Sequence, residues 1–152
     1  MAGKKTVPAS HAVPRLKSAP LPANPTVLDK LADDEQALVP DLRVRPSALA
    51  GLTQYGYSDS EIWALVIPKR TLARRQARRE PLTAEETDRA LRLARIAKLA
   101  ERVFGNSEKA NRWLRKPKQA LNGAMPVEFL ASEASARVVE GMLYRIQHGM
   151  FA

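Results

Sequence analysis

Two helix-start signals, one on each side of a strongly basic segment, most restrict how this chain folds. The stretches Ser58 to Glu61 and Thr83 to Glu86 both have the form of a capping box, in which a hydroxyl accepts from a backbone N–H and a glutamate reaches back. Pro68 divides the interval between them, because the residue before a proline disfavours the α region and a proline suits the first helical position. The sequence therefore predicts helices that begin near Ser58, at Pro68 and after Thr83.

The segment from Ile67 to Arg79 carries six cationic side chains and no acidic one. At helical pitch, about 100° per residue, its charged residues gather on one half of the cylinder. This half holds Arg70, Thr71, Arg74, Arg75, Arg78 and Arg79, and the packing half holds Leu72, Ala73, Gln76 and Ala77. Guanidinium groups on such a face reach phosphate oxygens and guanine edges. The alternative is a basic face that contacts only solvent.

The helix that begins near Ser58 has Ile62, Trp63 and Leu65 as apolar anchors and ends close to Pro68. Two helices joined by so short a corner follow the helix-turn-helix plan, in which the second helix enters the major groove of DNA. The corner lacks the glycine that such turns often contain. The predicted DNA-binding residues are Lys69, Arg70, Thr71, Arg74, Arg75 and Arg78.

Helical patterns continue to the end of the chain, and the predicted fold class is all-α. The longest helix runs from about Ala84 to Phe104, and its apolar residues are spread too widely for a single stripe. We interpret it as a spine that joins the helix-turn-helix lobe to a small C-terminal helical lobe. Shorter helices are expected over residues 27–38 and 47–54, and another is expected around Trp113, which we interpret as a core anchor. A further helix should begin at Pro126, and the last helix should end at Gly149. Residues 121–123 are expected to form a turn.

Composition agrees with a polyanionic partner and excludes some site classes. The 152 residues have a formal net charge of +9, which attracts nucleic acid, and no cysteine, which excludes disulfides and thiolate metal sites. Residues 1–25 contain no apolar stretch long enough for a signal peptide or membrane span, so we expect no membrane association and a cytoplasmic protein. Residues 1–45 read as a flexible or weakly helical arm, with or without a role in DNA contact.

Catalysis by this chain is not expected. His11 and His148 lie in unrelated parts of the sequence, and the scattered acidic residues read as helix caps and surface charge. No glycine-rich phosphate loop is present. We therefore predict no catalytic residue, no metal site and no cofactor.

The C-terminal half resembles the toxin-binding domain of the Xre/MbcA/ParS antitoxin family at many positions in order. They are Val103 to Gly105, Lys109, Ala110, Trp113, Leu114, Ala120 to Gly123, Pro126, Phe129, Leu130, Ser132, Glu133, Val138 and Arg145 to Ala152. Upstream, Ile67 to Arg74 and the run from Leu82 to Arg89 resemble the Xre-like helix-turn-helix half of those proteins. The chain departs from the family where Asn122, Ser135 and Tyr144 replace common glycines, although asparagine tolerates the left-handed region.

This resemblance implies an antitoxin of a type II toxin–antitoxin system. Such antitoxins bind RES-domain toxins, enzymes that consume NAD, and repress their own operon. The implied organisation is an arm over 1–45, a helix-turn-helix domain over 46–104 and a toxin-binding and dimerisation domain over 105–152. The alternative is a stand-alone dimeric helix-turn-helix transcriptional regulator.

The end of the chain is the predicted toxin contact. Gly149, Met150, Phe151 and Ala152 form an apolar hook with a terminal carboxylate, and Arg145 and His148 stand behind it. An apolar tip gains nothing from fraying into water, so a partner pocket would give it a purpose. The alternative is that the tip folds back onto the core of this chain.

For self-association, we expect a homodimer through Val138, Val139, Met142 and Ile146.

Overall fold

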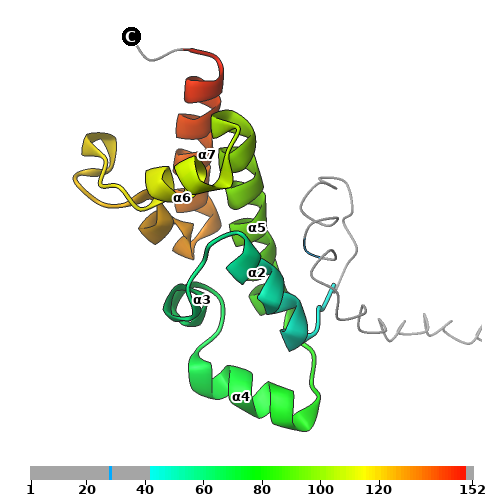
Figure 1. Cartoon of the computed structure of the whole chain (residues 1–152). Coiled ribbons are helices and arrows are strands. Elements are labelled where there is room, and N and C mark those ends of the chain that lie inside the picture. The colour runs from blue at the N-terminus through cyan, green and yellow to red at the C-terminus, as the bar shows by residue number, and fades with distance from the viewer. Residues whose placement is uncertain (1–27, 29–41, 150–152) are drawn as a thin grey trace, which may run out of the picture.

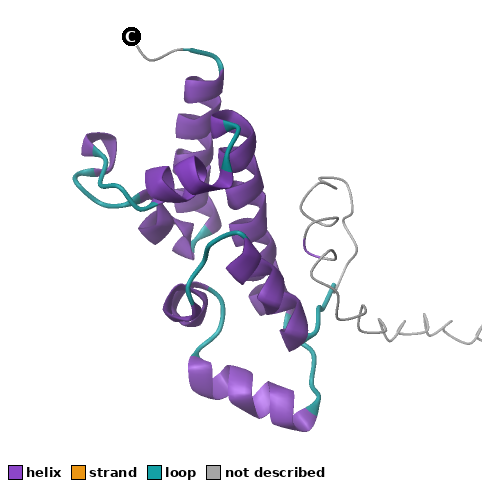
Figure 2. Ribbon diagram, viewed as in Figure 1, coloured by secondary structure: helices purple, strands orange, loops and turns teal. Residues whose placement is uncertain are grey.

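The computed structural model describes residue 28 and residues 42–149, and within these parts every regular element is helical (Figure 2). The all-α prediction is therefore confirmed for the described residues. In chain order the elements are η1 (Pro46–Leu49), α2 (Ala50–Gln54), α3 (Asp59–Leu65), α4 (Lys69–Arg78), α5 (Ala84–Phe104), α6 (Ser107–Leu114), η2 (Gln119–Leu121), η3 (Pro126–Ala131) and α7 (Glu133–Gln147).

Both predicted capping boxes are formed. Ser58 Oγ accepts from the Glu61 backbone N–H at 3.2 Å, and the Glu61 carboxylate accepts from the Ser58 N–H at 2.8 Å. Thr83 and Glu86 make the equivalent pair at 3.1 and 2.8 Å. The prediction for Pro68 is one residue early, because its ψ of 141° is extended and α4 begins at Lys69. Local side-chain chemistry thus sets where α3 and α5 begin.

Helix α5 is the spine of the molecule, as predicted (Figure 1). Helix α2 packs on its first half, and α6 and α7 pack on its second half. Its buried apolar side chains are Ala90, Leu93, Ala94, Ile96, Ala97, Leu99 and Ala100. They belong to one continuous core that also includes Leu52, Leu114 and Val139. The two lobes therefore share a core along α5.

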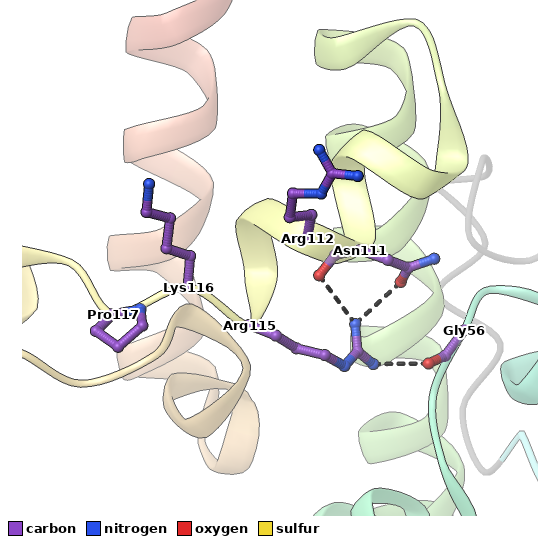
Figure 3. A pocket seen from close by; sticks show the side chains of 6 residues that line it. All are labelled: Gly56, Asn111, Arg112, Arg115, Lys116 and Pro117. Carbon is purple, nitrogen blue, oxygen red and sulfur yellow. Dashed lines mark hydrogen bonds between the residues drawn. The ribbon is translucent and has the colours of Figure 1, made fainter.

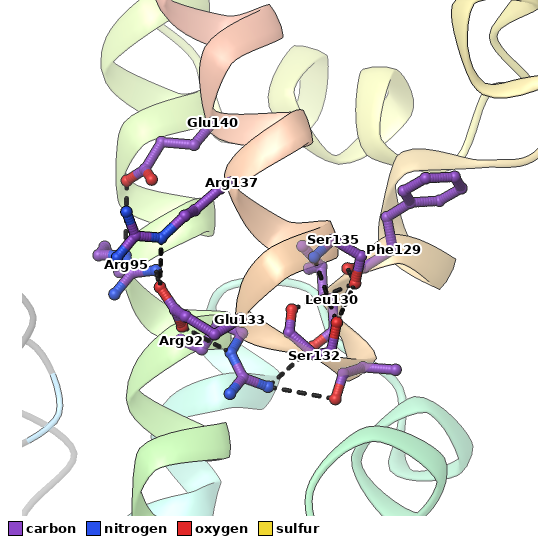
Figure 4. Close-up of polar contacts among 10 residues, drawn as sticks. Arg92, Arg95, Phe129, Leu130, Ser132, Glu133, Ser135, Arg137 and Glu140 are labelled. Atoms are coloured by element: carbon purple, nitrogen blue, oxygen red, sulfur yellow. Dashed lines mark hydrogen bonds and ion pairs between the residues drawn. The ribbon is translucent and has the colours of Figure 1, made fainter.

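A buried arginine fastens α7 to the spine (Figure 4). Arg92 on α5 donates to Glu133 at 2.9 Å and to the Leu130 carbonyl at 3.3 Å, while Arg95 donates to the other Glu133 oxygen at 2.7 Å. Burial acts to raise the pKa of Glu133, but the hydrogen bonds and charges of the two arginines outweigh it and lower the pKa below 4.5. Glu133 therefore stays ionised, and this junction weakens only when the pH falls through its lowered folded-state pKa.

The predicted dimer face on α7 is divided by the fold. Val139 and Met142 face the protein's own core at 0% and 4% exposure, whereas Val138 is 46% exposed. The four residues predicted to form one interface therefore point in different directions. Of the helix predicted over 27–38, the structure describes only Leu28, which is buried. No described helix is long and apolar enough to cross a membrane.

Candidate functional site

Helix α4 lies at one end of the molecule and has no fully buried residue (Figure 1). Its half-buried side chains are Thr71, Leu72 and Arg75, so this edge packs on the rest of the protein. Ala73, Gln76 and Ala77 are exposed. The face predicted from helical pitch is thus rotated: Thr71 and Arg75 belong to the packing edge, and the alanines to the outward face.

The outward face of α4 is cationic, and two of its charges have no ion-pair partner among the described residues. Arg70 and Arg74 are exposed and make no ion pair within the described part of the chain. Lys69 stacks its Nζ 4.7 Å from the ring centre of Trp63 on α3. Arg78 is exposed and lies 3.9 Å from Glu80. Four of the six residues predicted to bind DNA therefore lie on one accessible surface, Lys69, Arg70, Arg74 and Arg78.

Arg75 is held instead by Glu86 on the spine. Its Nη2 donates to Glu86 Oε1 at 3.2 Å, and its Nε forms an ion pair with Glu86 Oε2 at 3.0 Å. The two side chains are only 15% and 11% exposed. Glu86 also caps Thr83, so a single carboxylate fixes the start of α5 and the position of α4. The capping-box pattern predicts only the first of these roles for Glu86, because no local spacing relates Glu86 to Arg75.

At the other end of the molecule, α7 carries the predicted toxin contacts. Arg145 and His148 are exposed, and Gly149 ends the helix with a φ of 65°. Met150, Phe151 and Ala152 lie outside the described residues. Val138 and Tyr144, at 46% and 43% exposure, are the large exposed apolar side chains of the described chain, and both are on α7. This helix therefore presents an accessible surface of mixed charge and apolar character.

Other predicted features of the C-terminal lobe take structural roles. Trp113 lies at the core edge with its ring centre 5.7 Å from that of Phe104, and the Lys118 ammonium lies 4.9 Å above it. Asn122 adopts the left-handed region with a φ of 55°, so the turn survives without the family's glycine. The described residues contain no group of three His, Cys, Asp or Glu side chains placed to hold a metal ion.

Comparison with known proteins matches both lobes. Residues 45–95 match the antitoxin Xre-like helix-turn-helix domain, and residues 99–149 match the antitoxin Xre/MbcA/ParS C-terminal toxin-binding domain. Helices α3 and α4 fall within the first match, and α6 and α7 within the second. The two matches meet on the spine α5.

Curated relatives carry antitoxin names. "Antitoxin Xre" of Pseudomonas putida is 45% identical over 84 residues, which cover 55% of this chain and 53% of the relative. "Antitoxin Xre" of Yersinia enterocolitica is 33% identical over 57% of this chain and 59% of its own length, and "Prs ADP-ribosylating antitoxin" of a Sphingobium species is 33% identical over 59% and 62%. The matched part of the chain spans between about half and three fifths of the length of each of these relatives. With both domains matched, the chain belongs to the Xre/MbcA/ParS antitoxin family.

Proposed function

We propose that this protein is the antitoxin of a type II toxin–antitoxin system. In this proposal the C-terminal lobe binds a RES-domain, NAD-consuming toxin and covers its active site, and α4 binds operator DNA to repress the operon. The observation that carries the proposal is the match of residues 99–149 to a toxin-binding domain. That domain is joined by one spine to a helix-turn-helix domain with an accessible cationic helix.

Support for DNA binding comes from the outward face of α4. Arg70 and Arg74 are one helical turn apart and make no ion pair with any described residue, and Ala73 and Ala77 lie on the same exposed side. Small side chains beside the two arginines let the helix backbone approach the floor of the major groove. The alanine methyl groups also suit contact with thymine methyls, and the arginines suit guanine edges.

Support for an NAD-consuming partner is chemical. The name of the Sphingobium relative, "Prs ADP-ribosylating antitoxin", refers to ADP-ribosylation, which is a reaction that consumes NAD. In the proposed complex, Phe151 and Met150 fill apolar space in the cleft that holds the dinucleotide. Inhibition is then steric.

Deletion of Met150 to Ala152 tests the proposed mode of inhibition. When the truncated chain is co-expressed with its toxin, we expect NAD to fall and growth to stop, because the hook no longer fills the cleft. DNA binding should stay within about twofold, since α4 and the C-terminal end of α7 lie at opposite ends of the molecule (Figure 1). A truncated chain that still inhibits fully would place inhibition on the surfaces of α6 and α7.

We also propose that the protein is a homodimer, with the exposed face of α7 as the interface. Helix-turn-helix proteins commonly bind paired half-sites as two-fold dimers. The interface predicted from sequence is replaced by Val138 and Tyr144, which the fold leaves exposed.

The substitution Val138→Glu is therefore expected to convert the dimer to a monomer without unfolding it, since Val138 is outside the core. Light scattering of the full chain measures the mass, and thermal melting checks the fold. Gln147→Glu, which adds the same charge at another exposed position of α7, is the matched control. A dimer that persists in Val138→Glu would place the interface elsewhere.

The alternative function is a stand-alone dimeric transcriptional regulator. The two functions differ in whether a second protein is bound. Co-expression with the product of the adjacent gene, followed by affinity purification and size exclusion, separates them. We expect a stable complex of both proteins. A protein that binds DNA but forms no complex would be the regulator.

A further inference from the structure

The two helices that approach DNA have few apolar contacts of their own. Helix α3 buries only Ile62, and α4 buries no residue. A seven-residue helix with one buried side chain is held weakly by hydrophobic burial. Val66 and Ile67, between the two helices, are buried in the core, and polar anchors from other helices add to them in fixing the orientation of this pair. Glu86 on α5 provides one for α4.

Arg115, at the end of α6, provides the anchor for α3. Its Nε and Nη2 donate to the two oxygens of Glu61 at 3.0 and 2.8 Å. Its Nη2 also donates to the Gly56 carbonyl at 2.7 Å, and its Nη1 donates to the carbonyl and side chain of Asn111 at 3.3 and 3.0 Å. A guanidinium has five N–H donors. All five are used, so Arg115 is committed to this junction.

The residues that surround Arg115 pack closely on it and on one another. The Arg115 and Glu61 side chains are 28% and 22% exposed. Gly56 has a φ of 92°, and a Cβ there would overlap the Asn111 side chain that Arg115 holds. Tyr57, whose ring centre lies 5.6 Å from the guanidinium carbon, donates its hydroxyl to the Leu93 carbonyl at 2.8 Å. The chain before α3 is therefore fitted closely to both α6 and α5.

A recess of about 520 Å³ adjoins the junction, lined by Gly56, Asn111, Arg112, Arg115, Lys116 and Pro117 (Figure 3). Because every N–H of Arg115 already has a protein acceptor, this residue has no donor left for a ligand in the recess. Its role is thus internal.

The anchor acts on α4 through α3. Glu61 accepts from Arg115 and from the Ser58 N–H at the same time, so the start and the orientation of α3 are fixed together. Only the buried pair Val66 and Ile67 and the exposed Pro68 separate α3 from α4. Lys69 at the start of α4 stacks on Trp63 of α3.

We propose that Arg115 is a positioning residue for DNA binding: from the toxin-binding domain, it fixes the orientation in which α3 presents α4 to the groove. Arg115 lies within the match to the toxin-binding domain, and Glu61 within the match to the helix-turn-helix domain. The helix-turn-helix domain is therefore incomplete without α6. The proposal rests on the proposed DNA-binding function.

The test compares Arg115→Met, Arg115→Lys and Glu61→Gln in the full chain, with a duplex of the DNA upstream of its own gene as the probe. Arg112→Met is the matched control, because Arg112 is on the same helix, is 73% exposed and, among the described residues, forms its ion pair with Glu108 of that helix. We expect affinity to fall on the order of tenfold for Arg115→Met and Glu61→Gln, and less for the control. Glutamine at position 61 keeps an acceptor for the Ser58 N–H, so Glu61→Gln preserves the cap of α3. It therefore still tests the proposal if Arg115→Met does not fold.

Salt dependence distinguishes positioning from direct contact. A lost phosphate contact flattens the slope of log affinity against log salt by about one unit. For Arg115→Met we expect a weaker complex with an unchanged slope, and a double variant with Glu61→Gln no weaker than either single one. A flattened slope, or an affinity equal to that of Arg112→Met, would overturn the proposal. A parent chain that binds no DNA would instead overturn the proposed function.

Discussion

Replacement of both Arg70 and Arg74 by alanine is expected to abolish measurable operator binding at physiological salt. An arginine that contacts guanine through two hydrogen bonds contributes about 1–3 kcal/mol of discrimination. Both residues are exposed, lie one turn apart and have no ion pair among the described residues. The folded state should be unaffected, because neither side chain is buried. Fluorescence anisotropy with operator and random duplexes measures the loss.

The two duplexes also identify what each arginine contacts. A base-reading arginine loses affinity for operator more than for random DNA, whereas a phosphate-contacting one weakens both alike. The double variant Arg112→Ala and Arg137→Ala is the control, since it removes the same charge from residues that are 73% and 75% exposed on the C-terminal lobe. If the Arg70 and Arg74 variant bound operator as tightly as the parent chain, α4 would not be the DNA-reading helix.

The helix boundaries were predictable because their causes are local in sequence. The hydroxyl and carboxylate of each capping box are three residues apart, so Ser58 and Thr83 predict the starts of α3 and α5 directly. The left-handed conformations of Gly105 and Asn122 follow from residue types that tolerate a positive φ. The spread of apolar residues along α5 likewise predicted a helix covered on several sides.

The rotation of α4 was not predictable in the same way. Helical pitch fixes the angles between Arg70, Arg74 and Arg75, but not which side meets the protein. The deciding partner, Glu86, comes from the next helix and was already explained by its cap. The segment from Ile67 to Arg79 contains no acidic residue, so nothing in it distinguishes the structural Arg75 from the exposed arginines.

Contacts between distant segments also escaped the sequence analysis. Arg115 and Glu61 are 54 residues apart, and no spacing rule relates an arginine at the end of one helix to a glutamate at the start of another. On α7, Val138 and Val139 are adjacent and chemically identical, yet one is exposed and the other is in the core. Adjacent residues lie about 100° apart around a helix, and the packing of α7 on α5 and η3 decides which of the two is buried.

The second large effect is expected from Glu86→Ala. This change removes the glutamate half of the α5 capping box, while Thr83 Oγ1 can still accept from the backbone N–H of residue 86. It leaves Arg75, at 15% exposure, with Glu80 alone, whose Oε2 lies 3.7 Å from Nη1. Removing one member of a buried ion pair costs about 3–5 kcal/mol when the remaining charge has no partner, and we expect no more than this loss because Glu80 still faces the guanidinium. Chemical denaturation should show this loss as a lower midpoint with an unchanged slope. Glu85→Ala, a neighbouring acid at 85% exposure, is the control and should cost far less.

Glu86→Ala also separates the stability of the fold from the position of α4. Because Arg75 is the polar link between α4 and the spine, the variant should bind operator more weakly even under conditions where it is fully folded. Arg75→Met should reproduce the loss of DNA affinity and keep the cap of α5, since Glu86 still accepts from the Thr83 N–H. The difference in stability between the two variants then measures the cap and any remaining unpaired charge. If Arg75→Met kept parental DNA affinity, the Arg75–Glu86 pair would stabilise the fold without positioning the DNA-binding helix.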